Sequence, residues 1–391
     1  MFSSRTNWHL APNALTRVLK DVRSSGHEIL DLTISNPTEA GISPDPELVL
    51  SALVNPDSTR YDPQPRGLLS ARQAVCRYYH DAHRVFNLDP NRLILTTSTS
   101  EAYSYVFRLL SNPGDEILVP KPSYPLFEFL ADLADVKLVP YPLIYDHGWL
   151  IDFDSLYKAA SSRARAVIVV HPNNPTGNFA SAPETAALNA FCRDYNTALI
   201  VDEVFLDYAH DGEPRPSFAA NTDALTFTLS GISKISALPQ MKFAWVATSG
   251  PGEIVHEACA RLEVIADTFL SMNAPIQLAA PAFLDLRRQI QPILLDRLRA
   301  NLAELDAQLK PHPACARLQV EGGWYVILRV PALESDEDLA IRLLRHAHVS
   351  VHPGHFYDFP TEGHLVLSLI TEPEIFRQGI ARLLDFMRTQ T

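Results

Sequence analysis

The chain has 391 residues, of which 47% are hydrophobic and 20% are charged, so it can bury a large core in one large or two unequal domains. Its 33 basic and 45 acidic residues give a net charge of −12 at pH 7, which disfavours nucleic acid and anionic lipid as partners. No apolar run approaches the roughly twenty residues that span a bilayer, and the first residues lack the apolar core of a signal peptide.

The four cysteines lie far apart, without the paired spacing of a disulfide framework or a zinc site. The histidine pairs His346/His348 and His352/His355 lack a companion carboxylate pattern, so we interpret them as surface side chains and expect no metal. A reducing cytoplasm, without a membrane, is the expected location.

Short runs rich in β-branched residues alternate with helical patterns between about residues 90 and 250. The runs lie at residues 92–97, 116–119, 166–170, 198–201 and 225–229. Helices are expected at about residues 100–110 and 183–195, where Ser or Pro stands at the start, as helix entries prefer. This alternation predicts a mostly parallel sheet wrapped by helices, in a large domain over residues 46–280.

The rest of the chain follows a different pattern. Residues 252–310 are rich in leucine and alanine and predict one or more long helices. Strands are then expected at residues 324–329, 349–351 and 365–369, with helices near residues 337–346 and 372–388. These elements predict a small α+β domain over residues 281–391. We expect the N-terminal segment, residues 1–45, to pack against this domain and beside the ligand site.

A polar turn at residues 230–242 carries two lysines, Lys234 and Lys242, between apolar strands. An amine is a useful catalyst where it forms an imine with an aldehyde, and a second cation nearby suits the phosphate of pyridoxal phosphate (PLP). A lysine in a loop is by itself most often a solvated charge. The interpretation therefore depends on the other segments.

Two polar segments follow strands, at the edge where α/β folds bind ligands. In the segment TTSTSEA a strand ends and a helix begins, so the hydroxyls and free N–H groups of Ser98, Thr99 and Ser100 can bind phosphate. A simple helix cap is the alternative. The segment HPNNPTG is too kinked to continue its strand and presents Asn174 as a hydrogen-bond donor, unless it is only a structural turn.

Two further segments present a carboxylate and a ring at the same edge. Asp202, in VDEVF, closes an apolar strand and would be costly to bury without a cation such as a protonated pyridine. A helix cap or a surface salt bridge is the alternative. Tyr124, in PSYP, follows a strand and could stack on a planar heterocycle, although such a tyrosine more often belongs to the core or its rim.

In this order, the segments TTSTSEA, PSYP, HPNNPTG, VDEVF and SGISK resemble those of the class I and II aminotransferases, which are PLP enzymes of fold type I. The segments at residues 61–67 and 352–354 extend the resemblance over nearly the whole chain. The resemblance implies an α/β fold with a large PLP-binding domain, built on a mostly parallel seven-stranded sheet, plus a smaller α+β domain.

The resemblance also implies roles for individual residues. Lys234 matches the Schiff-base lysine, which holds the cofactor and later moves a proton between the substrate and the cofactor. Asp202 matches the carboxylate that keeps the pyridine nitrogen protonated. Tyr124 matches the stacking aromatic and Asn174 the amide on the phenolic oxygen. Lys234, Asp202 and Tyr124 are thus the expected catalytic residues.

A second group of residues is expected to bind the cofactor phosphate, and one of them comes from the partner subunit. The resemblance assigns the phosphate to Ser98, Thr99 and Ser100, with Lys242 where the family often has an arginine. Tyr61 matches a tyrosine that reaches the phosphate across a subunit boundary, which implies a homodimer with shared active sites.

Two positions beside the expected cofactor depart from the family. Phe205 stands where many members have a tyrosine that also binds the phenolic oxygen, and Gly231 replaces a frequent phosphate-binding serine. Ser230 or Ser233 could compensate for Gly231. The expected cofactor site therefore includes Ser230.

Val366 stands where many members have an arginine that binds the substrate α-carboxylate as a bidentate pair. Three explanations stay open. His364 could help if the alignment slips, another arginine such as Arg66 or Arg329 could substitute, or the amine substrate could lack an α-carboxylate.

The resemblance implies transamination, in which an amino acid or other amine donates its amino group to PLP and a 2-oxo acid accepts it. A PLP-dependent lyase or decarboxylase on the same fold is the alternative, because the fold does not decide which bond of the substrate breaks. A non-catalytic PLP sensor is the third hypothesis.

Overall fold

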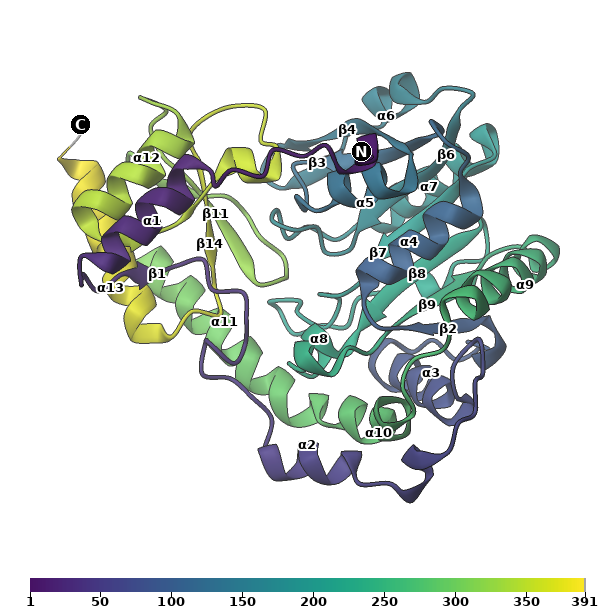
Figure 1. The fold of residues 1–391 in the computed structure, drawn as a ribbon. Helices are drawn as coiled ribbons and strands as arrows, with labels where there is room; N and C mark the ends of the chain where they lie inside the picture. The colour runs from purple at the N-terminus through teal and green to yellow at the C-terminus, as the bar shows by residue number, and fades with distance from the viewer. Residues whose placement is uncertain (390–391) are drawn as a thin grey trace.

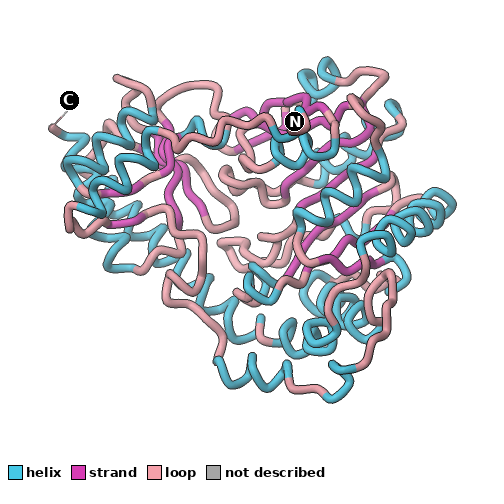
Figure 2. Tube along the Cα trace, viewed as in Figure 1, coloured by secondary structure: helices cyan, strands magenta, loops and turns pink. Residues whose placement is uncertain are grey.

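The computed structural model describes residues 1–389. It contains two main groups of strands, an eight-stranded sheet and a four-stranded sheet, with helices packed around each (Figure 1). Figure 2 shows loops facing one another between the two groups. No described helix is long and apolar enough to cross a membrane.

The large sheet is mixed but mostly parallel. In spatial order the strands are β2 (Leu93–Thr96), β9 (Ala244–Ser249), β8 (Thr226–Gly231), β7 (Ala198–Asp202), β6 (Ala164–Val170), β3 (Glu116–Lys121), β4 (Lys137–Tyr145) and β5 (Trp149–Ile151). Strands β3, β4, β6, β7 and β8 pair in parallel, whereas β9 runs antiparallel to both β8 and β2, and β5 antiparallel to β4.

The expected parallel sheet is confirmed, but its strand number is wrong by one. The expected seven strands become eight because β4 turns back after Tyr145 into β5, which pairs with it over three residues. A three-residue strand is too short to carry a recognisable alternation in the sequence.

Helices cover both faces of this sheet. One face buries side chains of α4 (Thr99–Leu110), α5 (Phe127–Ala134) and α9 (Gly252–Phe269), and the other buries side chains of α6 (Phe153–Ala159) and α7 (Ala182–Tyr195). Alternate residues of the strands supply the two faces; in β7, for example, Ile200 faces the first group and Val201 the second. The helices expected near residues 100–110 and 183–195 are confirmed as α4 and α7.

The leucine-rich stretch after the large sheet forms three helices, namely α9, α10 (Ala274–Asp285) and α11 (Arg287–Leu309). Helix α10 packs on α2 (Pro46–Leu53) and α3 (Leu69–His83), beside the large sheet. Helix α11 leads away to the small sheet and packs on the closing helix α13 (Pro373–Arg388). The chain therefore passes from the large-sheet group to the small-sheet group at Leu286, between α10 and α11.

The small sheet is antiparallel, with the order β10 (Ala316–Arg317), β11 (Tyr325–Arg329), β14 (His364–Ser368) and β13 (His352–Pro353). Helix α12 (Asp336–Arg342) continues into a π-helical turn, Leu343–Ala347, beside it. The N-terminal part of the chain joins this group, since β1 (Leu30–Asp31) pairs with β12 (Val349–Ser350) and α1 (Ala14–Ser24) packs on α12. The domain limits at residues 45 and 280 stay predictions.

Candidate active site

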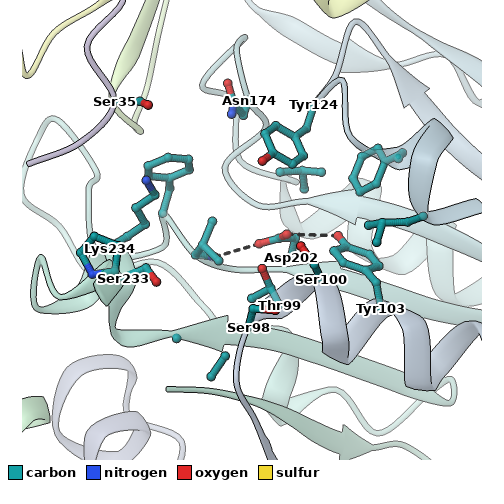
Figure 3. Close-up of a pocket in the computed structure, with 18 of the residues that line it drawn as sticks. Ser35, Ser98, Thr99, Ser100, Tyr103, Tyr124, Asn174, Asp202, Ser233 and Lys234 are labelled. Atoms are coloured by element: carbon teal, nitrogen blue, oxygen red, sulfur yellow. Dashed lines mark hydrogen bonds between the residues drawn. The ribbon is translucent and has the colours of Figure 1, made fainter. Parts of the chain in front are cut away.

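A cavity of about 340 Å³ lies at the carboxyl edge of the large sheet, where the parallel strands end together. Side chains that follow β2, β3, β6, β7 and β8 line it, and the small sheet and the N-terminal segment contribute to its wall (Figure 3). The lining includes Ser35, Thr97, Ser98, Thr99, Ser100, Tyr103, Tyr124, Asn174, Asp202, Phe205, Gly231, Ser233, Lys234, Lys242 and Tyr325.

The N-terminus of α4 opens into this cavity. Ser98 caps the helix by accepting a hydrogen bond from the backbone N–H of Glu101 at 3.1 Å. Thr97 donates to the Glu101 carboxylate from its backbone N–H, at 2.6 Å, and from its hydroxyl, at 2.9 Å. The N–H groups of Thr99 and Ser100 lie in the first turn, where a helix has no acceptor of its own. Together with the helix dipole they make a site for an anion.

Asp202 is the last residue of β7 and only 8% exposed. Its Oδ2 accepts a hydrogen bond from the Tyr103 hydroxyl at 3.1 Å, and its Oδ1 accepts one from the backbone N–H of Val204 at 3.1 Å. Burial raises the pKa of Asp202 to about 6, against the opposing effects of these hydrogen bonds and of the Lys234 charge. The cavity therefore holds a carboxylate that lacks a close cation.

Lys234 lies in the short helix α8 (Ile232–Ile235), directly after β8. Its backbone carbonyl accepts a hydrogen bond from the Tyr208 hydroxyl at 2.6 Å, which fixes this turn. The Nζ atom lies 4.7 Å from the ring centre of Trp324 and 5.6 Å from that of Phe205. Burial lowers the pKa of Lys234 to about 8. About a tenth of its amine is then neutral and nucleophilic at pH 7, roughly three hundred times more than at the ordinary pKa of a lysine.

Asn174 and Tyr124 lie on the opposite side of the cavity from Lys234 (Figure 3). Asn174 is 8% exposed, and its Oδ1 is buried without a hydrogen-bond partner among residues 1–389. The ring of Tyr124 packs edge-on against Phe127, with 6.0 Å between ring centres, and 39% of the residue stays exposed. The buried amide of Asn174 and the exposed part of the Tyr124 ring can therefore both contact a ligand in the cavity.

Two tyrosines that line the cavity, Tyr103 and Tyr325, were not predicted from the sequence, and Ser233 was named there only as a possible substitute. Tyr103 is one helical turn after Thr99 on α4 and therefore on the same face, a spacing that could have revealed it. Tyr325 belongs to the small sheet and lies outside the five family-like segments, so nothing in the sequence indicated that it lines the cavity. Ser233, named only as a substitute for Gly231, lines the cavity beside Lys234.

Two expected cofactor residues are not brought to the cavity of this chain. Ser230 does not line the cavity, contrary to expectation. Its side chain is buried within β8, and its hydroxyl donates to the carbonyl of Glu203 at 3.4 Å. Tyr61 is 81% exposed and does not line the cavity. Its expected role needs a second subunit and stays a prediction.

The structure explains the glycine at position 231. Gly231 pairs with Ala244 of β9, and a Cβ atom at position 231 would lie 2.8 Å from the carbonyl oxygen of Phe243. A serine there would require β9 to shift. The close approach of β8 and β9 therefore favours glycine at position 231.

The cavity fits PLP on the evidence of its own groups. The amine of Lys234 would hold the aldehyde, and the uncompensated Asp202 carboxylate would bind a protonated ring nitrogen. The side-chain N–H of Asn174, which lines the cavity, would donate to the phenolic oxygen, and the N-terminus of α4 with Lys242 would hold the phosphate. A nucleophilic lysine, a carboxylate and an anion site at the carboxyl edge of such a sheet define a PLP-dependent enzyme of fold type I.

Comparisons with known proteins agree with this class. Residues 27–378 match the family model described as "Aminotransferase class I and II". The glutamate-pyruvate aminotransferase AlaA of Haemophilus influenzae is 26% identical over 94% of this chain and 92% of its own length. The transaminase BacF of Bacillus subtilis is 28% identical, covering 93% of this chain and 90% of its own.

Among solved structures, the alanine aminotransferase of Pyrococcus furiosus superposes with a TM-score of 0.90 at 24% identity, over the whole of both chains. The chain belongs to the class I and II aminotransferase family. It is a PLP-dependent aminotransferase, which moves an amino group between an amino acid or other amine and a 2-oxo acid. The family match favours this activity over the lyase, decarboxylase and sensor alternatives.

Proposed function

We propose that Lys234 is the residue that performs the proton transfer of this aminotransferase. PLP, when bound, supplies the aldehyde and the electron sink. The Lys234 amine holds the cofactor until a substrate amine displaces it, and the freed Nζ then removes the proton at the substrate Cα. The pKa of about 8 supports this role, because the amine has to be neutral to accept a proton near neutral pH.

Asp202, Tyr124 and Asn174 orient the cofactor ring in this proposal. The Asp202 carboxylate would hold the ring nitrogen protonated, and the Tyr103 hydroxyl on α4 holds Asp202 in place by donating to its Oδ2. Tyr124 would stack on the ring and the Asn174 side-chain N–H would donate to the phenolic oxygen, so these residues would orient the ring.

Ser98, Thr99 and Ser100 bind the phosphate through the first turn of α4, with Lys242 as the added charge. Lys242 lines the same cavity and follows the turn Pro239–Met241 in a left-handed conformation, φ 52°. A lysine binds phosphate as a point charge and not as a bidentate fork. The helix N–H groups therefore supply most of the directional contacts.

The observation that carries the proposal is the pairing in one cavity of a lysine with a lowered pKa and a carboxylate with a raised pKa. The test is the absorbance spectrum of the PLP-loaded protein during stepwise addition of an amine and a 2-oxo acid. The wild type should lose and regain the band of the aldehyde form, and Lys234→Ala should do neither. Lys158→Ala, an exposed lysine of α6 outside the cavity, is the matched control.

We also propose that the enzyme is a homodimer with shared active sites. Leu50, Val54 and Tyr61 are 61%, 82% and 81% exposed, and apolar side chains so exposed within a short stretch are typical of a surface that another chain covers. Mixing inactive Lys234→Ala subunits with impaired Tyr61→Ala subunits should restore activity, because one site of each hybrid is then intact. Additive residual activity would contradict shared sites.

Domain organisation and location complete the proposal. We take residues 46–280 as the large PLP-binding domain and residues 281–391 as the small domain, with residues 1–45 packing on the latter; limited proteolysis near residue 280 would test this division. All four cysteines are free, which supports a reducing compartment such as the cytoplasm.

A further inference from the structure

The wall of the cavity facing the small sheet is polar but carries no positive charge. Ser35 of the N-terminal segment and Tyr325 of β11 line this wall. Figure 3 shows Ser35 on the side of the cavity away from Ser98 and Thr99. Burial raises the pKa of Tyr325 to about 12, against the opposing effect of the Ser35 side chain, so the Tyr325 hydroxyl stays neutral. No arginine among residues 1–389 lines the cavity.

The register of the small sheet places Val366 behind this wall. Tyr325 pairs with Ser368, and Val366 is two residues from Ser368 on the same strand, so all three side chains share one face of the sheet. The Ser368 hydroxyl donates to the carbonyl of Ile34, next to Ser35. Val366 is fully buried, and its neighbour across the sheet is His352.

The nearby ionisable groups do not supply a cation in place of Val366. Burial lowers the pKa of His352, whose Nδ1 shares a hydrogen bond with the Tyr357 hydroxyl at 3.0 Å. The other charge that acts on His352 is the carboxylate of Asp31. The Asp31 carboxylate itself lies 3.7 Å from the guanidinium of Arg23, so this end of the site is close to neutral.

Neither alternative arginine lines the cavity. Arg66 donates to Glu263 at 2.7 Å and to the carbonyl of Asn91 at 2.5 Å. Arg329 lies four residues beyond Tyr325 at the other end of β11, exposed, and pairs across the sheet with His364. His364 has its Nδ1 on the carbonyl of Thr361 and does not line the cavity.

A carboxylate placed against this wall would lose its hydration without gaining a cation, which is unfavourable. A hydroxyl in the same place could both donate to and accept from Ser35 and Tyr325, because each of their hydroxyls can do both. We infer that one of the two substrates is a primary amine with a hydroxyl-bearing neutral group where an α-amino acid has its carboxylate. Its product is the matching hydroxy ketone or hydroxy aldehyde.

The inference rests on the proposed transamination and needs no further reactant. The amine carbon loses its nitrogen and one hydrogen and gains a carbonyl oxygen from water. The cofactor retains the nitrogen and the electron pair until a 2-oxo acid takes both, becomes an amino acid and releases water. The 2-oxo acid and amino acid of this second half-reaction bind without an arginine, so their KM values should be high.

Matched pairs of compounds test the inference on the PLP-loaded wild-type protein. L-alaninol and L-alanine differ only in a hydroxymethyl group against a carboxylate, as do L-phenylalaninol and L-phenylalanine. The rate at which each converts the cofactor band, divided by its concentration, should favour the alcohol by about tenfold or more. Equal or faster conversion by the amino acids overturns the inference while transamination stands, and no conversion by any of the four overturns both.

Binding without turnover gives an independent readout. The apoprotein should bind N-(5′-phosphopyridoxyl)-L-alaninol more tightly than N-(5′-phosphopyridoxyl)-L-alanine, and Val366→Arg should reverse this order, whereas Val366→Leu should keep it. Tighter binding of the alanine adduct by the wild type overturns the inference, whether or not the arginine variant folds.

Discussion

The buried carboxylate of Asp202 makes the affinity for PLP depend on pH in a way that can be calculated. Burial raises the pKa of Asp202 from 3.8 to about 6, and this shift of about two units corresponds to about 3 kcal/mol. That free energy measures how unfavourable the ionised carboxylate is without a cation. A protonated ring nitrogen relieves this cost on binding, so ionised Asp202 contributes to the affinity.

The pKa of Asp202 also gives the direction in which the affinity for PLP changes with pH. Above pH 6 Asp202 is ionised in the apoprotein and can pair with the ring nitrogen, whereas below pH 6 it takes up a proton and the pairing is lost. At pH 8, Asp202→Asn should therefore weaken PLP binding by about a hundredfold. At pH 5 the difference between the variant and the wild type should shrink to less than about tenfold.

Equilibrium titration of the apoprotein with PLP, followed by absorbance between pH 5 and 8, measures both quantities. Because the cofactor's own protonation affects both proteins equally, the ratio of their affinities at each pH reports only on the protein. Asp223→Asn, an exposed carboxylate outside the cavity, should behave as the wild type. Equal affinities of Asp202→Asn and the wild type at pH 8, or a difference that does not change with pH, would refute the reasoning.

Three further predictions concern single residues. Tyr103→Phe removes the hydrogen bond to Asp202, so turnover should fall about five- to tenfold and the midpoint of PLP affinity should move to higher pH; an unchanged midpoint would exclude this contact. Gly231→Ser should lower the stability by about 1–3 kcal/mol, measured by urea unfolding, because its Cβ would approach the Phe243 carbonyl at 2.8 Å, and a stable variant would show that β9 yields easily. The rate of PLP capture by the apoprotein should rise about tenfold per pH unit up to the Lys234 pKa of about 8 and then level off; a rise that continues to pH 10 would place that pKa near its ordinary value.

Residues that follow a strand directly could be predicted from the sequence. Asp202, Asn174 and Tyr124 each follow an apolar run, and parallel strands bring their carboxyl ends to one edge whatever the details of the turns. The order of the strands was not needed for this step. The same reasoning placed Lys234 and the first turn of α4 in one cavity.

Other features of the site depend on contacts that the sequence does not encode locally. Ser230 was misplaced because successive side chains of a strand point to opposite faces, and the sequence does not say where β8 ends. Ser35 and Tyr325 come from segments nearly 300 residues apart along the chain, brought together by the small sheet. The reason for a glycine at position 231 became clear only from the pairing register of β8 against β9, which the sequence does not show.

The central claim is that Lys234 carries the cofactor, and chemical trapping tests it most directly. The PLP-loaded protein is reduced with borohydride, digested, and the modified lysine is located by mass spectrometry. The account predicts a single pyridoxyl label on the peptide that contains Lys234, with Lys242 unmodified. A label on Lys242 with Lys234 free, or a reduced protein with no label, would contradict it.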